Sequence, residues 1–399
     1  MKVRRRKIIL AVLVLSLFTT LFFPSSVRAA DLRVAGWLPY WRAAEGARDA
    51  KKHLDTLDTI YPFVFSLKSD GSLKDLGELK KNGWPNLFKA ARAKDVAIIP
   101  TITAGSGNLI HSLLVDPLAR QRHIAEIVKM VEKGNYDGVD IDYEGKLSAS
   151  YALFPIFLSE LKQALGDKTL VCTIEARTPP DSLYRAIPAV LTYANDLAKI
   201  GAACDVVQIM AYDQQRADLK LNDARKGLPY APTADKDWVK KVLELMTKSI
   251  PAEKIMLGVP TYGAEYEVTI SPNWFQGYKK LWALNPSYGE DTAKKYKIKP
   301  TRNAAGELAF AYVPKESALK LSRSLAIPAG TPKGLAVAAR ALTYANQTGQ
   351  TIKINYVSWS DAEAVAAKVK LAEEFGLHGV AIFKIDGGED KKIWDIFED

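Results

Sequence analysis

Three carboxylates at alternate positions of one short segment are the residues best suited to chemistry in this sequence. Asp140, Asp142 and Glu144 alternate with apolar residues in the segment Asp137-Gly-Val-Asp-Ile-Asp-Tyr-Glu144. This alternation predicts a strand that turns all three carboxylates to one face. Neighbouring carboxylates repel one another and resist burial, so a folded protein keeps them where a raised pKa is useful or where a cation neutralises them.

Two simpler interpretations fit this segment less well. A solvated acidic edge strand would not need the apolar residues that flank each acid. A calcium loop of the EF-hand type places its glycine after the alternating acids, whereas Gly138 precedes them here. The four histidines lack the spacing of metal ligands. We therefore expect an acid-based site that needs no metal and no cofactor.

The first 29 residues are typical of a secretory signal peptide. Five positive charges between Met1 and Lys7 precede the apolar run Ile8–Phe23, and Val27-Arg-Ala29 suits signal peptidase. An uncleaved membrane anchor is the alternative, but the apolar run is short for one. We expect a secreted or cell-envelope protein whose mature chain, 30–399, is not stably inserted in a membrane.

The net charge of the whole chain comes mostly from this signal. Removing residues 1–29 lowers the formal charge from +10 to +4, because it leaves 49 basic residues against 45 acidic ones. No basic stretch interleaved with aromatic residues remains, so nucleic acid is not an expected partner. The only two cysteines, Cys172 and Cys204, could form one disulfide or remain two small buried residues.

Short apolar runs that favour strands alternate with longer amphipathic stretches. The predicted strands are Val34–Trp41, Thr59–Leu67, Val96–Ala104, Gly138–Glu144, Leu170–Ala176, Val206–Tyr212, Ile255–Tyr262 and Gly379–Ile385. The clearest predicted helices are Asp116–Lys133, Tyr151–Leu165 and Ser360–Phe375. Eight strands alternating with helices predict an α/β protein with a (β/α)8 barrel.

One long segment interrupts the alternation. Residues 268–356, between the seventh and eighth strands, contain turn formers and further strand-like runs, Leu308–Val313 and Thr351–Val357. We expect a small α+β insertion on a barrel loop, and a separate C-terminal domain is the alternative.

Barrel enzymes place their catalytic residues at the C-terminal ends of the strands. Glu144 ends the fourth predicted strand, Tyr212 and Asp213 end the sixth, and Phe383 lies near the end of the eighth. These side chains should therefore converge on one cleft.

The same segments carry a family resemblance that spans essentially the whole mature chain. The acidic strand resembles the DxxDxDxE motif of glycoside hydrolase family 18, the chitinases and their relatives. Gln208-Ile-Met-Ala-Tyr-Asp213 is similar to the family's M-x-Y-D motif, and Leu257-Gly-Val-Pro-Thr-Tyr-Gly263 to its G-x-P-x-Y-G motif. Three motifs in the right order make the resemblance specific.

The resemblance implies a role for each matching residue. Glu144 would be the general acid, Asp142 would orient the substrate's acetamido group, and Asp140 would tune Asp142. Tyr212 would complete the catalytic set by a hydrogen bond to the acetamido group. Met210 would line the pocket, and Asp213 would help polarise the site. Asp137 lies an odd number of positions before the other acids, so it does not share their face of the strand. It is expected to be structural.

Aromatic residues supply the remaining candidates for substrate binding. The family commonly has Trp at the end of the eighth strand, where this sequence has Phe383, whose ring offers less area and no N–H donor. Phe383 could also be core packing alone. Trp41 is favoured over Trp37 as a sugar platform, and Tyr262 is expected to line the cleft. Gly145 follows the acid where bulkier residues are frequent, which would open the cleft beside Glu144.

The resemblance implies a retaining hydrolase in which the substrate's own acetamido group assists, cutting β-1,4 bonds after N-acetylglucosamine. Chitin, peptidoglycan or N-glycans would be the partner polysaccharide. The end segment Gly387-Gly-Glu-Asp390 with Trp394 resembles the bacterial cell-wall branch and favours peptidoglycan. The alternative is a catalytically silent glycan-binding protein on the same barrel. We expect a monomer.

Overall fold

The structure is a computed structural model, and it describes residues 32–398. The predicted signal peptide, residues 1–29, lies outside this range. Within the range, no helix has the length and apolar character needed to cross a membrane.

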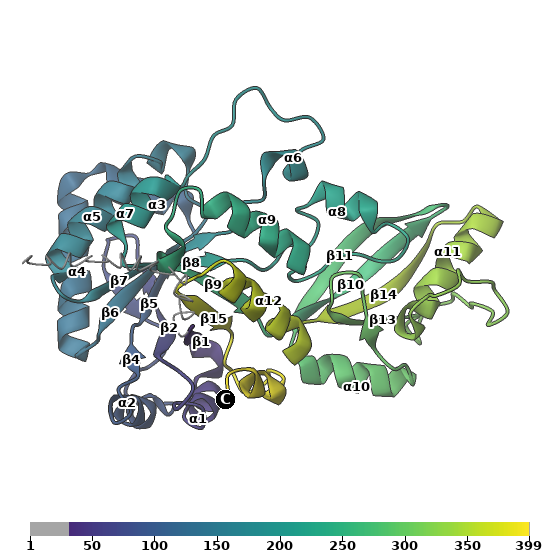
Figure 1. Ribbon diagram of the computed structural model, residues 1–399, viewed down its shortest axis with the longest axis horizontal. Helices are drawn as coiled ribbons and strands as arrows, with labels where there is room; N and C mark the ends of the chain where they lie inside the picture. The colour runs from purple at the N-terminus through teal and green to yellow at the C-terminus, as the bar shows by residue number, and fades with distance from the viewer. Residues whose placement is uncertain (1–31, 399) are drawn as a thin grey trace, which may run out of the picture.

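Eight parallel strands form a closed barrel, the left-hand body in Figure 1. They are β1 (Arg33–Pro39), β2 (Thr59–Leu67), β5 (Thr101–Ala104), β6 (Gly138–Tyr143), β7 (Thr169–Glu175), β8 (Val206–Met210), β9 (Ile255–Pro260) and β15 (Gly379–Phe383). The barrel closes because β1 pairs with both β2 and β15. The predicted (β/α)8 architecture is thereby confirmed.

The third predicted strand is the one that the structure divides. A two-residue strand, β4 (Ala97–Ile98), and β5 both pair with β2, and Ile99 and Pro100 separate them. The prediction of one continuous strand over Val96–Ala104 was wrong because Pro100 has no N–H to donate to a ladder. A short strand, β3 (Leu73–Asp75), adds to β2 in antiparallel fashion.

Helices surround the barrel. They are α1 (Ala43–Ala50), α2 (Trp84–Arg92), α3 (Gly107–Val115), α4 (Pro117–Gly134), α5 (Leu153–Leu165), α6 (Pro180–Leu183), α7 (Leu197–Ala203), α8 (Leu219–Ala224), α9 (Lys236–Met246) and α12 (Ala362–Glu374). Short 3-10 turns are η1 (Tyr40–Arg42), η2 (Ser148–Ser150), η3 (Ala252–Lys254) and η5 (Lys391–Ile396). Side chains of Asp116 and Asp361 cap α4 and α12 by accepting backbone N–H groups, which is why these helices begin where they do.

A second sheet stands beside the barrel, at the right in Figure 1. Its antiparallel strands are β10 (Gly263–Ser271), β11 (Trp274–Leu284), β12 (Thr301–Arg302), β13 (Leu308–Tyr312) and β14 (Ile352–Trp359). The helices α10 (Pro286–Tyr296) and α11 (Ala336–Thr348), with the turn η4 (Lys333–Leu335), accompany it. The chain then returns through α12 to the last barrel strand, so this unit is an insertion and not a separate C-terminal domain. Its sheet runs from Gly263 to Trp359, so the insertion extends beyond both ends of the predicted one, residues 268–356.

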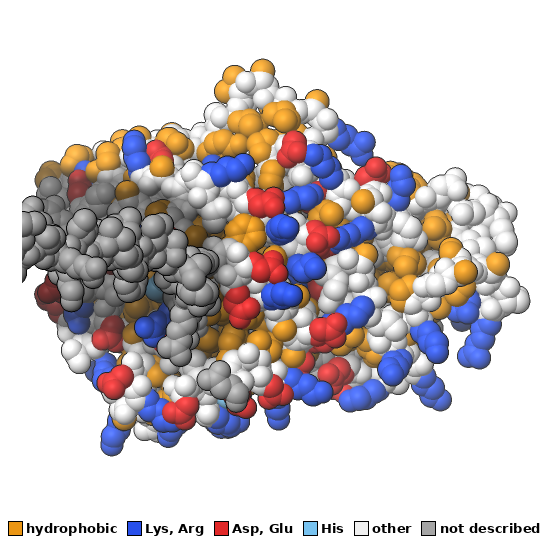
Figure 2. All heavy atoms as spheres, viewed as in Figure 1, with side chains coloured by type: hydrophobic (Ala, Val, Ile, Leu, Met, Phe, Trp, Pro, Cys, Tyr) orange, Lys and Arg blue, Asp and Glu red, His pale blue; other side chains and the backbone are white. Residues whose placement is uncertain are grey.

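The loop between β7 and α7 projects from the barrel, at the top in Figure 1. Figure 2 shows hydrophobic side chains gathered at its tip. Tyr184, Ile187 and Val190 of this loop are exposed. The loop therefore rises on the side of the barrel where strand ends and candidate site residues lie.

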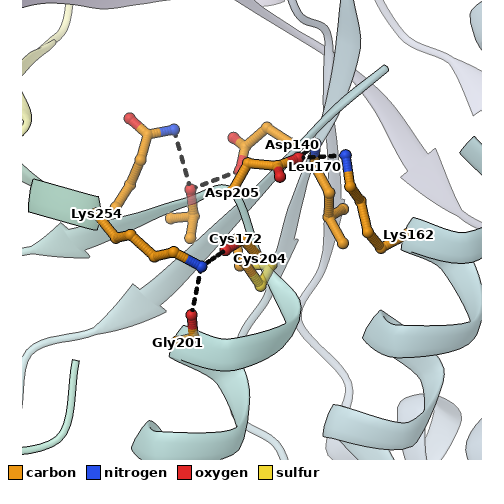
Figure 3. Close-up of a disulfide and its surroundings, with 10 residues drawn as sticks. Asp140, Lys162, Leu170, Cys172, Gly201, Cys204, Asp205 and Lys254 are labelled. Atoms are coloured by element: carbon orange, nitrogen blue, oxygen red, sulfur yellow. Dashed lines mark hydrogen bonds and ion pairs between the residues drawn. A yellow bond between two sulfur atoms is a disulfide. The ribbon is translucent and has the colours of Figure 1, made fainter. Parts of the chain in front are cut away.

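A disulfide joins Cys172 of β7 to Cys204, the residue that ends α7, with 6.1 Å between their Cα atoms (Figure 3). Nζ of Lys254 donates to the backbone carbonyls of Gly201 and Cys204, each at 3.0 Å. Of the two states that the sequence left open for the cysteines, the structure has the bonded one. The bond fastens α7 to the strand that neighbours β6.

Candidate active site

Asp140 and Asp142 lie inside the barrel on β6, as the alternation of the strand requires. Asp140 is fully buried and accepts three hydrogen bonds. Thr101 and Thr173, on the two neighbouring strands, donate at 2.7 Å, and the indole of Trp37 donates at 3.3 Å. Burial raises the pKa of Asp140 to about 6, although these donors act to lower it. Asp140 is thus held rigidly from three strands.

Asp142 is buried without such support. It is 3% exposed, and its Oδ1 has no hydrogen-bond partner among the described residues. Burial first, and then the charges of Glu144 and Asp140, raise the pKa of Asp142 well above its ordinary value. Since an unpartnered buried carboxyl oxygen is costly, this atom is available to a ligand that brings a donor.

Glu144 follows the last residue of β6 and is partly exposed at the C-terminal end of the barrel. Burial is the largest cause that raises its pKa, and Glu175 and Asp213 raise it further, whereas Lys146 lowers it. A carboxyl group with a raised pKa keeps its proton to a higher pH than a free glutamate does, and it can donate that proton to a leaving oxygen.

The end of β8 brings further predicted residues to the same opening. Met210 is the last residue of β8, and its register partner on β7 is Glu175. The phenol of Tyr212 remains protonated because burial, and then the charges of Asp142 and Glu144, raise its pKa. Asp213 has a positive φ of 53° and is exposed, with Lys280 of the second sheet 3.7 Å away.

Phe383 lies at the centre of an aromatic cluster at the end of β15. Its ring stacks on Tyr212 at 5.1 Å between centroids, and it meets Tyr262 and Trp37 edge to face at 6.0 and 5.7 Å. The peptide bond from Phe383 to Lys384 is cis. The cluster forms an apolar floor beside the carboxylates, and a sugar face can stack on such a floor.

A cavity of about 430 Å³ extends from this floor. It is lined by Trp41, Arg42, Asp213, Tyr262, Lys280, Ala283, Leu284, Asn285, Phe383, Lys384 and Asp386. Trp41 is 50% exposed, whereas Trp37 is buried and bound to Asp140. Most of the lining residues from the barrel end or follow β15 or its neighbours β1 and β9, and β15 is opposite β6 in the closed barrel order, whereas Asp213 follows β8 between them. The cavity therefore lies across the opening from Glu144.

Two charged residues beside Glu144 were missed by sequence reasoning. Lys146 and Glu175 form an ion pair with 3.5 Å between Nζ and Oε2. The available signal was that Glu175 ends the strand next to the acidic strand, at the end of the barrel where sites lie. Asp137 accepts the backbone N–H of Ile98 at 2.7 Å, a contact between strands at the opposite end of the barrel.

Comparison with known proteins assigns the family. A family model described as Glycosyl hydrolases family 18 matches residues 36–388. The chain therefore belongs to this family of glycoside hydrolases, which confirms the family and the enzyme class predicted from its motifs.

Individual relatives are distant. The chain is 24% identical over 295 residues to the uncharacterized glycosylase YvbX of Bacillus subtilis (strain 168), covering 72% of this chain and 68% of that protein. The crystal structure of the Bacillus cereus spore cortex-lytic enzyme SleL is similar with a TM-score of 0.65 and 20% identity, covering 92% and 73% of the two chains. The crystal structure of a chitinase from Chromobacterium violaceum is similar with a TM-score of 0.65 and 19% identity, covering 92% of this chain and 98% of that chain. These two structures support the fold.

Proposed function

We propose that this glycoside hydrolase is a retaining enzyme that cuts β-1,4 bonds after N-acetylglucosamine with the help of the substrate's own acetamido group. The observation that carries the proposal is the unpartnered Oδ1 of Asp142, buried next to Glu144. An acetamido N–H is a donor of the kind this oxygen lacks. The same contact would direct the acetamido oxygen toward the anomeric carbon.

The proposed reaction has two steps. Glu144 donates its proton to the glycosidic oxygen while that oxygen leaves the anomeric carbon, and the acetamido oxygen forms a new bond to that carbon. The resulting oxazolinium ion carries positive charge near Asp142. Water, deprotonated by Glu144, then attacks the anomeric carbon and opens the ring with net retention. Tyr212, a protonated phenol in this site, would donate to the acetamido oxygen.

The roles of the two aspartates follow from their surroundings. Asp140 is held by three donors and can keep its charge as the reaction proceeds. Asp142 has no fixed partner at Oδ1 and can turn its hydrogen bonding toward the substrate. Phe383, Tyr262 and Met210 would surround the sugar ring before the cut, and Trp41 would stack on a sugar farther along the cavity.

We further propose that the polymer is a peptidoglycan strand. The cavity opposite Glu144 would take the sugars that precede the cut, and three cations line it. Lys384 is paired with Asp386, but Arg42 has no carboxylate within 4.0 Å among the described residues. Lys280 has only its 3.7 Å contact with Asp213. In peptidoglycan the sugar next to N-acetylglucosamine bears a lactyl group with a carboxylate or a peptide, whereas chitin carries no anion.

The test is mass spectrometry of products from chitopentaose and from purified peptidoglycan strands. We expect fragments that end in reducing N-acetylglucosamine, and we expect their release from peptidoglycan to be faster than from chitopentaose. Glu144→Gln should release no fragments from either substrate. Full activity of Glu144→Gln would refute the assigned acid. If the wild-type protein binds both glycans and releases nothing, the glycan-binding alternative holds.

Export is part of the proposal, because peptidoglycan lies outside the cytoplasmic membrane. The amino-terminal pattern of charge, apolar run and small residues supports it. We expect the protein recovered from the culture medium or cell wall to begin at residue 30, as determined by amino-terminal sequencing.

A further inference from the structure

The turn that follows Glu144 contains a buried positive charge. The side chain of Lys146 has no exposed surface, and its ammonium lies 4.7 Å from the centroid of the Phe154 ring. It donates to the backbone carbonyl of Tyr143. Burial lowers the pKa of Lys146, against the effect of the carboxylates around it. A buried cation is tolerated where a counter-charge offsets its desolvation, so Lys146 requires an acid beside it.

Glu175 is that acid, and it also holds the backbone. Its Oε2 lies 3.5 Å from Nζ of Lys146 and accepts from Nδ2 of Asn195 at 3.0 Å. Its Oε1 accepts the backbone N–H of Gly145 at 2.9 Å. Gly145 has a φ of 63°, so the chain turns sharply directly after Glu144. One carboxylate from β7 therefore fixes this turn, the buried lysine and the end of the projecting loop.

Charged groups on several elements face Glu144. Glu175 comes from β7, Asp213 from the segment after β8, and Lys146 from the turn itself. Asp142 lies on β6 just before Glu144, and burial, and then the charge of Glu144, raise the pKa of Asp142. Burial of Glu144 and the charges of Glu175 and Asp213 raise its pKa, and Lys146 is the group that lowers it.

We propose that Lys146 and Glu175 are positioning residues for the general acid. This ion pair, whose lysine is buried and whose glutamate is partly exposed, holds the turn that follows Glu144. The two charges act in opposite directions on the proton of the Glu144 carboxyl. The role of Glu144 as general acid rests on the proposed function. The contacts of the pair do not depend on that role, so its effect on the Glu144 proton can be measured without turnover.

The experiment is a titration of Glu144 by carbon NMR in protein labelled at the Glu carboxyl carbons, with the Glu144 signal assigned by its loss in Glu144→Gln. Glu175→Gln removes a negative charge, so the midpoint is expected to move to lower pH. Lys146→Met removes a positive charge, so it is expected to move to higher pH. Above the wild-type midpoint, kcat/KM on chitopentaose should differ between the two variants by on the order of tenfold, since only protonated Glu144 is active.

Two further variants control the test. Glu267→Gln removes a carboxylate that pairs with Lys353 at 2.7 Å in the second sheet, and it should leave the midpoint unchanged. In the double variant of Glu175→Gln with Lys146→Met, the buried lysine and its acid are removed together. It should therefore fold even if Glu175→Gln, which leaves Lys146 without its counter-charge, does not, and its midpoint should lie near that of the wild type.

The outcomes separate the two proposals. Opposite shifts in the single variants support the positioning role even if the wild-type protein cleaves no glycan, in which case only the proposed function fails. Midpoints that stay in place, or that move in the same direction in both single variants, overturn the positioning role whatever the activity. If only the double variant folds, a midpoint clearly displaced from that of the wild type overturns it.

Discussion

Individual carboxyl groups in this site differ by the donors that surround them. Asp140 has three donors from three strands, and Asp142, two residues away, has an oxygen with none. The acids themselves could be predicted from the sequence, because alternation along a strand is a local property. Lys146 and Glu175 could not be paired in advance, because their contact joins a turn to a strand 29 positions along the chain.

Trp41 allows a prediction about glycan binding at a single residue. Because its ring is half exposed on the cavity wall, Trp41→Ala should weaken binding with little effect on folding. We expect the Kd for chitopentaose to rise about tenfold, measured by calorimetry in the Glu144→Gln background, where no substrate is consumed. Trp274→Ala is the matched control, because Trp274 is 52% exposed and lies outside this cavity. Equal losses in the two variants would contradict a platform role for Trp41.

Among the elements, β6 carries the two buried aspartates and β7 carries Glu175. The sequence predicted the barrel strands well because each is a buried apolar run with turn formers at its ends. It could not place β10, which follows β9 after only two residues and leaves the barrel for the second sheet. β9 is a continuous apolar run, whereas β10 alternates apolar with polar residues. Both patterns form strands, and only the tertiary pairing assigns one strand to the barrel and the other to the insertion.

The disulfide between β7 and α7 is expected to stabilise the protein. It closes a loop with a sequence separation of 32, which in the chain-entropy model is worth about 3 to 4 kcal/mol. The paired substitution of Cys172→Ala with Cys204→Ala should therefore lower the free energy of unfolding by about that amount, measured by denaturant titration. Addition of reductant should lower the wild-type value and leave the Ala variant unchanged. Equal stability of the two proteins under oxidising conditions would argue against a bond in solution.

At the scale of the whole molecule, buried acids link stability to pH. Burial, and then the carboxylate of Asp49, raise the pKa of Glu389 to about 8. Oε1 of Glu389 has no donor partner among the described residues, and a proton on Glu389 removes the repulsion between its carboxylate and that of Asp49. Glu389 lies after the last barrel strand and Asp49 lies on α1, so protonation of Glu389 removes a repulsion between the segment after β15 and the first helix.

The direction in which pH changes the stability follows from the number of protons that the folded and unfolded states bind. Between the ordinary pKa of Glu389 and about pH 8, the folded state binds more protons than the unfolded state, so its stability is lost as pH rises. Burial lowers the pKa of His53, His123 and His378, which acts in the opposite sense below about pH 6.5. The melting temperature should therefore fall from pH 6.5 to 8, measured by calorimetry.

Two Gln variants isolate the source of this slope. Glu389→Gln should flatten the fall in melting temperature, because the amide does not titrate. Glu374→Gln, at an exposed position near the end of α12, should leave the slope as it is in the wild type. A slope that is the same in all three proteins would assign the effect to other groups.

The register of the second sheet has a consequence for engineering and for the divergence of related chains. Gly263, where the chain leaves the barrel, is the direct cross-strand partner of Trp359, where it comes back. Partners in an antiparallel pair have Cα atoms roughly 5 Å apart, so a tight turn could bridge them. The segment between Gly263 and Trp359 is therefore a unit that could be exchanged for another. Because it contributes Lys280 and Asn285 to the cavity, exchanging it would change the wall that the polymer meets while leaving the acids of β6 in place.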